Sequence, residues 1–137
     1  MKNKKKVVFI VDVKDRDLEG LKRIGIYLKD LNYKSIYLPS NVESKTVIQQ
    51  NPEAIIIPKA NFNKPLLSLC KLNGIKIIVI DTEGNPQDKN YKLNIPIEPN
   101  LYLFWNKSYS ERYKNFLLCK KEPLYTVNTS MLHTKKG

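Results

Sequence analysis

The sequence predicts an α/β fold: a three-layer, Rossmann-like domain around a mostly parallel sheet of five or six strands. Two observations lead to this prediction. Short apolar runs alternate along the chain with segments of helical periodicity. These runs also lack the polar–apolar alternation of half-exposed strands, which is typical of strands that helices cover on both faces. A chain of 137 residues is long enough for one domain with a substantial core.

The first part of the chain contains the clearest elements. Strands are expected at residues 7–11, 34–39, 54–58 and 76–80, and helices at 18–31, 40–50 and 65–72. The first helix has an apolar stripe at spacings of three and four residues, and Asp15 or Asp17 can cap its start. Pro65 suits the first turn of the third helix, and Gly74 suits the position just past its end.

The rest of the chain is less regular. A long polar loop with several prolines is expected at residues 81–100, followed by a fifth strand at 101–104. A helix is expected at 108–119 and a sixth short strand at 123–127. The predicted domain therefore covers residues 1–127. Residues 128–137 are expected to form a disordered or truncated tail.

The charge balance is strongly basic, at +11 with a sequence pI of about 9.6. The lysines are dispersed and only three residues are arginine, which disfavours a nucleic-acid partner. A generally basic surface is expected instead, with weak attraction to anionic lipids as a secondary possibility. No apolar run approaches the ~20 residues of a membrane span. We therefore expect a cytoplasmic protein, at most peripheral at the inner face of the membrane.

The sequence contains few residues that could bind a metal ion or a cofactor. Cys70 and Cys119 are far apart in the sequence, and His133 is the only histidine, so no metal site is predicted. Both cysteines are expected to be small apolar side chains on helices. The stretch "VDVKDRD" after the first strand contains no glycine, which argues against a dinucleotide or P-loop site. No cofactor is predicted.

A ligand site is expected at the carboxyl ends of the strands, where the strand order reverses. In the order 3-2-1-4-5, the first and fourth strands would be neighbours. Asp12 and Arg16 would then face Asp81 and Glu83 across one crevice. In the alternative order 2-1-3-4-5, the reversal lies beside the third strand and Lys59 becomes the closer residue.

Each candidate also has a structural explanation. The acidic residues near Arg16 can interact with the helix dipole, and Arg16 itself can pair with one of them. Asp81 can cap a turn in which Gly84 supplies a positive φ. Trp105 can serve packing rather than sugar stacking. Glu83 has the weakest structural explanation.

Four stretches together resemble a known family. They are "VFIVDVKDRDLEGLKRIGIYLKDLNYKSIYLP", "AIIIPK", "GIKIIVIDTEGN" and "LYLFWNKSYSERY". The chain resembles, over about residues 6–127, the N-terminal half of bacterial surface carbohydrate biosynthesis proteins. Those proteins are similar to glycosyltransferases with two Rossmann domains and distantly to glycerophosphotransferases of teichoic-acid assembly. The most telling matches are Arg16 with the two residues after it, the turn at 81–84, and Trp105.

The resemblance implies an acceptor-side domain that supplies a catalytic base, while a C-terminal domain holds the nucleotide-sugar donor. Glu83 or Asp81 would be the base, and Arg16 would bind a phosphate or an acidic sugar. Asp12, Lys59, Gly84 and Trp105 complete the expected substrate-binding set. The acceptor would be a carbohydrate, free or lipid-linked.

The chain departs from the family in two places. Asn106 stands where a glycine is common, and "VNTSMLHTKKG" replaces a glycine–proline turn that leads into the donor domain. The chain is therefore expected to be a fragment, a relic, or a subunit that pairs with a separate donor-binding domain. Alone, it is expected to turn over nothing, because catalysis needs donor and acceptor held together.

Two other classes remain as alternatives. One is a non-catalytic flavodoxin-like or receiver-like binding module. A receiver would need an aspartate at the tip of its third strand, where this chain has Pro58–Lys59–Ala60. The other is a basic nucleic-acid-binding protein, whose affinity would fall steeply with salt. The dispersed lysines and the lack of an aromatic–basic motif disfavour it.

Overall fold

The computed structural model describes residues 4–59, 61–80 and 97–103, and for Arg16 the backbone alone. Strands and helices alternate in this part of the chain, as predicted. The elements are β1 (Lys5–Val11), α1 (Lys14–Asp30), β2 (Tyr33–Pro39), α2 (Ser44–Gln49), β3 (Ala54–Ile57), α3 (Lys64–Leu72), β4 (Lys76–Ile80) and β5 (Leu101–Leu103). The predicted helix at 108–119, the strand at 123–127 and the tail at 128–137 lie outside the described residues.

The five strands form one sheet in which every neighbouring pair is parallel. Their order is β2-β1-β3-β4-β5. The α/β, three-layer prediction is therefore confirmed, whereas the expected order 3-2-1-4-5 is wrong and the alternative order 2-1-3-4-5 is the one observed. The reversal of strand order lies between β1 and β3.

The composition of β2 and β3 explains this order. β2 contains Lys34, Ser35 and Tyr37, and none of its residues is fully buried. β3 consists of four apolar residues that are all buried. An edge strand tolerates polar residues because only one neighbour covers it, while a strand between two others must be apolar on both faces. β2 therefore lies at the edge and β3 in the middle.

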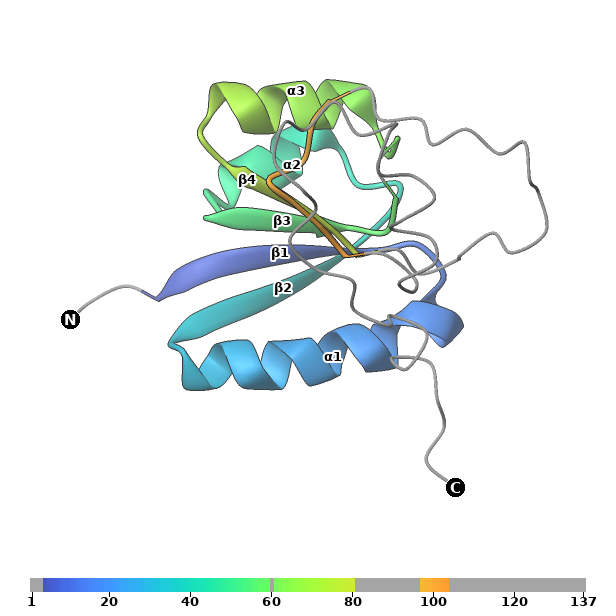
Figure 1. Ribbon diagram of the computed structural model, residues 1–137, viewed down its shortest axis with the longest axis vertical. Helices are drawn as coiled ribbons and strands as arrows, with labels where there is room; N and C mark the ends of the chain where they lie inside the picture. Colours follow the sequence, from blue (N-terminus) through green and yellow to red (C-terminus); the bar gives the residue numbers. More distant parts are fainter. Residues whose placement is uncertain (1–3, 60, 81–96, 104–137) are drawn as a thin grey trace.

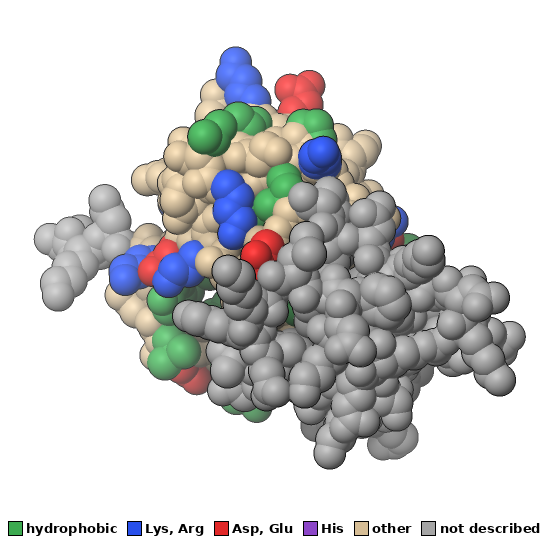
Figure 2. Space-filling model, turned by 45° about the horizontal axis from the view of Figure 1, so that its top comes forward, with side chains coloured by type: hydrophobic (Ala, Val, Ile, Leu, Met, Phe, Trp, Pro, Cys, Tyr) green, Lys and Arg blue, Asp and Glu red, His purple; other side chains and the backbone are tan. Residues whose placement is uncertain are grey.

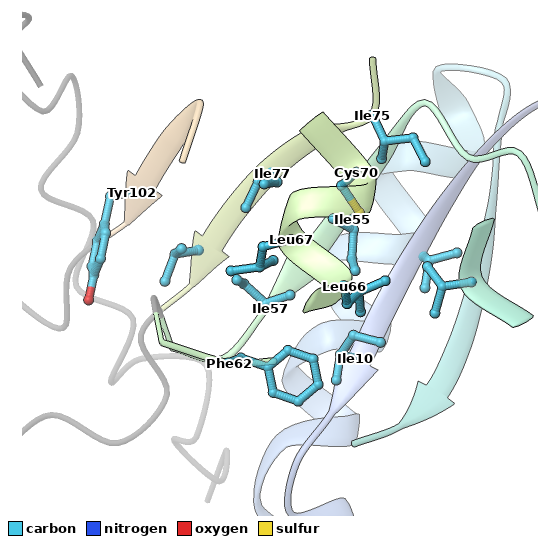
Figure 3. Packing of buried hydrophobic residues seen from close by; sticks show 13 residues of the cluster. Ile10, Ile55, Ile57, Phe62, Leu66, Leu67, Cys70, Ile75, Ile77 and Tyr102 are labelled. Atoms are coloured by element: carbon cyan, nitrogen blue, oxygen red, sulfur yellow. The ribbon is translucent and has the colours of Figure 1, made fainter. Parts of the chain in front are cut away.

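Helices cover both faces of the sheet, with α1 on one side and α2 and α3 on the other (Figure 1). Right-handed crossovers account for this arrangement. The chain moves across the sheet in one direction from β1 to β2 and in the opposite direction from β2 to β3, so the connecting helices lie on opposite faces. The larger apolar cluster lies under α2 and α3, where side chains of α3 point onto β3 and β4 (Figure 3). A second cluster, which includes Phe9 and Leu21, lies under α1.

The ends of α3 follow local sequence signals. Asn63 precedes the helix in a left-handed conformation, with φ of 43°, and its side-chain oxygen accepts a hydrogen bond from the Leu66 N–H at 3.2 Å. Pro65 lies in the first turn, as predicted. Gly74 follows the helix with φ of 69°, a conformation that glycine adopts without strain. Both predicted boundaries of this helix are confirmed.

Cys70 lies on α3 with its side chain fully buried in the larger cluster. The expectation of a small apolar side chain is therefore confirmed for Cys70, and Cys119 lies outside the described residues. Burial raises the pKa of the Cys70 thiol from 9.0 to about 11, because the thiolate would lose its hydration.

This raised pKa predicts a loss of stability in alkali. The folded state favours the neutral thiol, so the stabilisation is complete below pH 9.0, where the thiol of the unfolded chain is also protonated, and is lost between pH 9.0 and about 11. In a Cys119→Ser background, the free energy of unfolding should fall more steeply over this range than in the same chain carrying Cys70→Ala. Urea unfolding followed by circular dichroism measures the difference. Equal pH dependence of the two proteins would contradict the prediction.

Candidate functional site

The carboxyl ends of the strands form one edge of the sheet, which we call the carboxyl edge. β1 ends at Val11, β3 at Ile57 and β4 at Ile80, and all three point the same way. β3 lies between β1 and β4, so the first and fourth strands are not neighbours. The predicted crevice between them is therefore wrong, because the strand order differs from the one on which it depended.

A pocket of about 260 Å³ opens at this edge, between the ends of β1 and β2 and the start of α1. Its lining combines apolar side chains with a carboxylate, an ammonium group and a hydroxyl. The lining residues are Val11, Asp12, Lys14, Leu18, Tyr37, Leu38, Pro39 and Ser40. The Ser40 N–H donates to the Val11 carbonyl oxygen at 3.1 Å, which continues the pairing of β1 and β2 beyond the last ladder residue. This bond holds Ser40 beside Asp12.

The Asp17 side chain stabilises the start of α1, because the N-cap residue has no polar side chain that could cap the helix. Val13 occupies the N-cap position, and its N–H donates to Asp17 Oδ2 at 3.1 Å. The Asp17 N–H in turn donates to the Val13 carbonyl oxygen at 2.8 Å. The prediction that Asp15 or Asp17 is the N-cap residue is wrong, because Val13 occupies that position. The Asp17 carboxylate instead accepts a hydrogen bond from the N-cap residue, from a position inside the helix.

Asp17 is the only buried charged residue among those described, with 1% of its surface exposed. Its carboxylate accepts a hydrogen bond from the N-cap residue of α1, and Asp15 lies in the same first turn. The positive end of the helix dipole is therefore already compensated by the protein's own carboxylates. This arrangement favours uncharged polar groups over a phosphate at this helix start.

Tyr37 forms the inner wall of the pocket. Its ring stacks on Phe9 with centroids 4.9 Å apart, and its hydroxyl contacts the Leu21 carbonyl oxygen at 3.5 Å. Desolvation raises the pKa of the Tyr37 phenol. The nearby Ser35 hydroxyl lowers the same pKa, but by less than desolvation raises it. The buried Ser35 oxygen does not form a hydrogen bond with the phenol. Tyr37 is therefore a neutral, well-packed wall of the pocket.

The structure brings only part of the predicted site together. Asp12 lines the pocket, and Arg16 follows in the first turn of α1. Lys59 is exposed just beyond β3, next to the reversal of strand order but outside the pocket lining. Asp81, Glu83, Gly84 and Trp105 lie outside the described residues, so their roles stay predictions.

Of the polar residues that line the pocket, sequence reasoning missed three: Lys14, Tyr37 and Ser40. The signal that could have found them is the polar character of β2. A tyrosine on an edge strand, followed by a serine directly after the strand, places polar groups beside the end of β1. Among the residues that the structure describes, no group of histidine, cysteine and acidic side chains could hold a metal ion.

Comparisons with known proteins identify no family. No family model matches the chain, and no curated protein sequence matches it. A solved structure that matches part of the chain is a carbohydrate-transporter solute-binding protein from Chloroflexus aurantiacus in complex with D-glucose. The TM-score is 0.44 at 15% sequence identity, and the match covers 60% of this chain and 28% of that one. The chain thus matches little more than a quarter of that protein's length.

Proposed function

We propose that this chain is the acceptor-side, Rossmann-like domain of a glycosyltransferase of surface-polysaccharide assembly, acting with a separate donor-binding domain or subunit. The observation that carries the proposal is the pocket at the carboxyl edge of the parallel sheet. Open α/β sheets bind their ligands at this edge. The resemblance of the sequence to surface carbohydrate biosynthesis proteins adds the class of reaction.

The pocket chemistry fits a sugar. Sugars present hydroxyl groups that donate to carboxylates, such as that of Asp12, and accept from ammonium and hydroxyl groups, such as those of Lys14 and Ser40. Their C–H faces pack on apolar walls, which Tyr37 and Pro39 supply here. A pocket of about 260 Å³ has room for a sugar residue or two but not for a complete nucleotide sugar.

The strand order favours a second candidate, a non-catalytic binding module of the flavodoxin type. The observed order β2-β1-β3-β4-β5 is the order of flavodoxin-like sheets, whose ligands bind at the reversal between the first and third strands. Lys59 would then be the nearest charged residue beyond β3. This candidate predicts a ligand between β1 and β3 rather than between β1 and β2.

NMR titrations of the ¹⁵N-labelled full chain separate these candidates. Maltose and glucose should shift the amide signals of Lys14 and Ser40 in a saturable way, while UDP-glucose and FMN should not. Lys14→Gln should weaken maltose binding about fivefold, because replacing a charged hydrogen-bond donor with a neutral one costs about 1 kcal/mol. Lys22→Gln, which removes an exposed charge from the middle of α1, is the matched control and should leave binding unchanged.

Three outcomes would contradict the first proposal. FMN shifts centred on residues 12 and 58–59 would favour the flavodoxin-like module instead. Transfer of sugar from UDP-glucose by the isolated chain would show that no separate donor domain is needed. Failure of every sugar to shift Lys14 and Ser40 would remove the pocket as an acceptor site.

A further inference from the structure

The edge opposite the pocket concentrates positive charge. We call it the amino edge: the starts of the parallel strands together with the ends of the helices that precede them. Its basic residues are Lys4, Lys5, Lys6, Lys29, Lys34, Lys71 and Lys76, and its acidic residues are Asp30, Glu53 and Glu98. By contrast, the charges of the described residues at the carboxyl edge nearly balance. Figure 2 shows basic side chains, with an acidic one between them, beside the N-terminal end of the described chain.

Two exposed leucines lie among these lysines. Leu31 follows the last residue of α1 and is 68% exposed, while Leu72 ends α3 and is 82% exposed. The two helices lie on opposite faces of the sheet, so the leucines flank the strand starts from both sides (Figure 1). A cationic surface with exposed apolar side chains matches the interface of an anionic bilayer, which attracts lysines and takes up leucines.

Local structure explains only some of the lysines. Lys29 and Lys71 lie in the last turns of their helices, where a positive charge also favours the helix dipole. Lys5 pairs with Glu53 at 3.7 Å. Lys34 and Lys76 are exposed residues at the starts of β2 and β4, where a positive charge does not stabilise the fold through a helix dipole. These two lysines are therefore the most informative positions to test.

We propose that the amino edge docks the protein on the surface of an anionic lipid bilayer. Lysines supply the attraction to lipid headgroups, and Leu31 and Leu72 insert below the headgroups at two points of the contact. The exposed leucines favour lipid over nucleic acid, which offers no apolar layer for them. None of the described helices is long and apolar enough to cross a membrane, so the proposed contact is with the bilayer surface.

This docking orients the pocket. The longer strands β1, β2 and β4, with five to seven residues each, separate the two edges by roughly 15–20 Å. With the amino edge on the bilayer, the pocket at the carboxyl edge opens toward the aqueous phase. The pocket then meets either a soluble ligand or the outer part of a lipid-linked glycan. Docking does not depend on which ligand the pocket takes, so it can fail or succeed independently of the proposed function.

Vesicle sedimentation with matched charge variants tests the proposal. The full chain should bind vesicles of phosphatidylcholine mixed with phosphatidylserine and not vesicles of phosphatidylcholine alone. Each lysine at the surface changes the binding constant about fivefold, so the pair Lys34→Gln and Lys76→Gln should weaken binding on the order of 20-fold. The control pair Lys45→Gln and Lys64→Gln removes the same charge from the starts of α2 and α3 at the carboxyl edge. It should change binding less than about threefold, because these residues lie beyond a Debye length of ~8–10 Å.

The leucines give a second, salt-resistant readout. Leu31→Ser with Leu72→Ser should abolish the binding that remains in high salt, while circular dichroism verifies that the variant is folded. Equal losses for the two lysine pairs, or no binding to anionic vesicles, would overturn the proposal. Tighter, steeply salt-dependent binding of a DNA duplex through Lys34 and Lys76 would also overturn it, by assigning this edge to nucleic acid.

Discussion

Replacing Leu66 with alanine is expected to lower the free energy of unfolding by about 3 kcal/mol, within a range of about 2–5 kcal/mol. The Leu66 side chain is fully buried and points from α3 onto the sheet, near Ile10 and Ile57 (Figure 3). Truncation removes apolar contacts and leaves a cavity under a short helix, which cannot close the gap without losing its other contacts. A domain of this size has only about 5–15 kcal/mol of stability, so the loss is large.

The same helix provides a matched control. Leu72 is also a leucine on α3, but it is 82% exposed at the end of the helix. Leu72→Ala should change the free energy of unfolding by less than about 0.5 kcal/mol. Urea unfolding followed by circular dichroism measures both variants at constant m-value. A loss for Leu72→Ala as large as that for Leu66→Ala would show that α3 does not pack as described.

Replacing Gly25 with alanine is expected to destabilise the fold by about 1–2 kcal/mol, although alanine is the better helix former by about 1 kcal/mol. Gly25 lies in α1 against β2, and a Cβ atom there would collide with the Tyr37 hydroxyl oxygen and come within 3.1 Å of Ser35 Oγ. The Tyr37 ring cannot swing aside freely, because it stacks on Phe9. Packing therefore outweighs propensity at this position.

A double-mutant cycle isolates this collision. Tyr37→Phe removes the hydroxyl and keeps the ring, so Gly25→Ala should become neutral or slightly stabilising in that background. The expected coupling between the two changes is about 1–2 kcal/mol, measured by urea unfolding of the four proteins. Additive effects would mean that α1 and β2 adjust to the extra methyl group without strain. The result bears on the pocket as well, because Tyr37 forms its inner wall.

The two edges of the sheet divide the proposed roles. The carboxyl edge holds a pocket with balanced charges, whose helix start is already occupied by the Asp17 carboxylate. The amino edge holds lysines and exposed leucines. Because both proposals are tested by substitutions on different edges, the result at one edge does not decide the result at the other.

Local signals in the sequence were enough to predict most elements. The apolar runs at β1, β3 and β4 and the periodic stripe of α1 predicted their own conformations, because those patterns reflect burial of the residues that carry them. Pro65 and Gly74 marked the ends of α3 for equally local reasons of backbone geometry. The α/β class followed from the alternation of these elements.

Strand neighbours could not be predicted in the same way. β1, β3 and β4 are apolar on both faces, so each fits beside any other, and only the polar residues of β2 distinguish an edge strand from a central one. The choice of order 2-1-3-4-5 depends on the direction of the crossover through α2, which is a non-local property. In this order β4 is not a neighbour of β1. Tyr37 and Ser40 of the β2 region line the same pocket as Asp12.

The chain's linear pattern thus predicted which of the described segments are strands and helices and which apolar residues form the core. Tertiary structure alone decided that Asp17 near the start of α1 is buried and that Lys14 and Ser40 share a pocket. It also decided that the scattered lysines of five strand and helix boundaries meet at one edge. The physical reason is that periodicity reports only whether a residue is buried. Which residues meet depends on strand order and crossover direction, and these are set by packing between segments far apart in the chain.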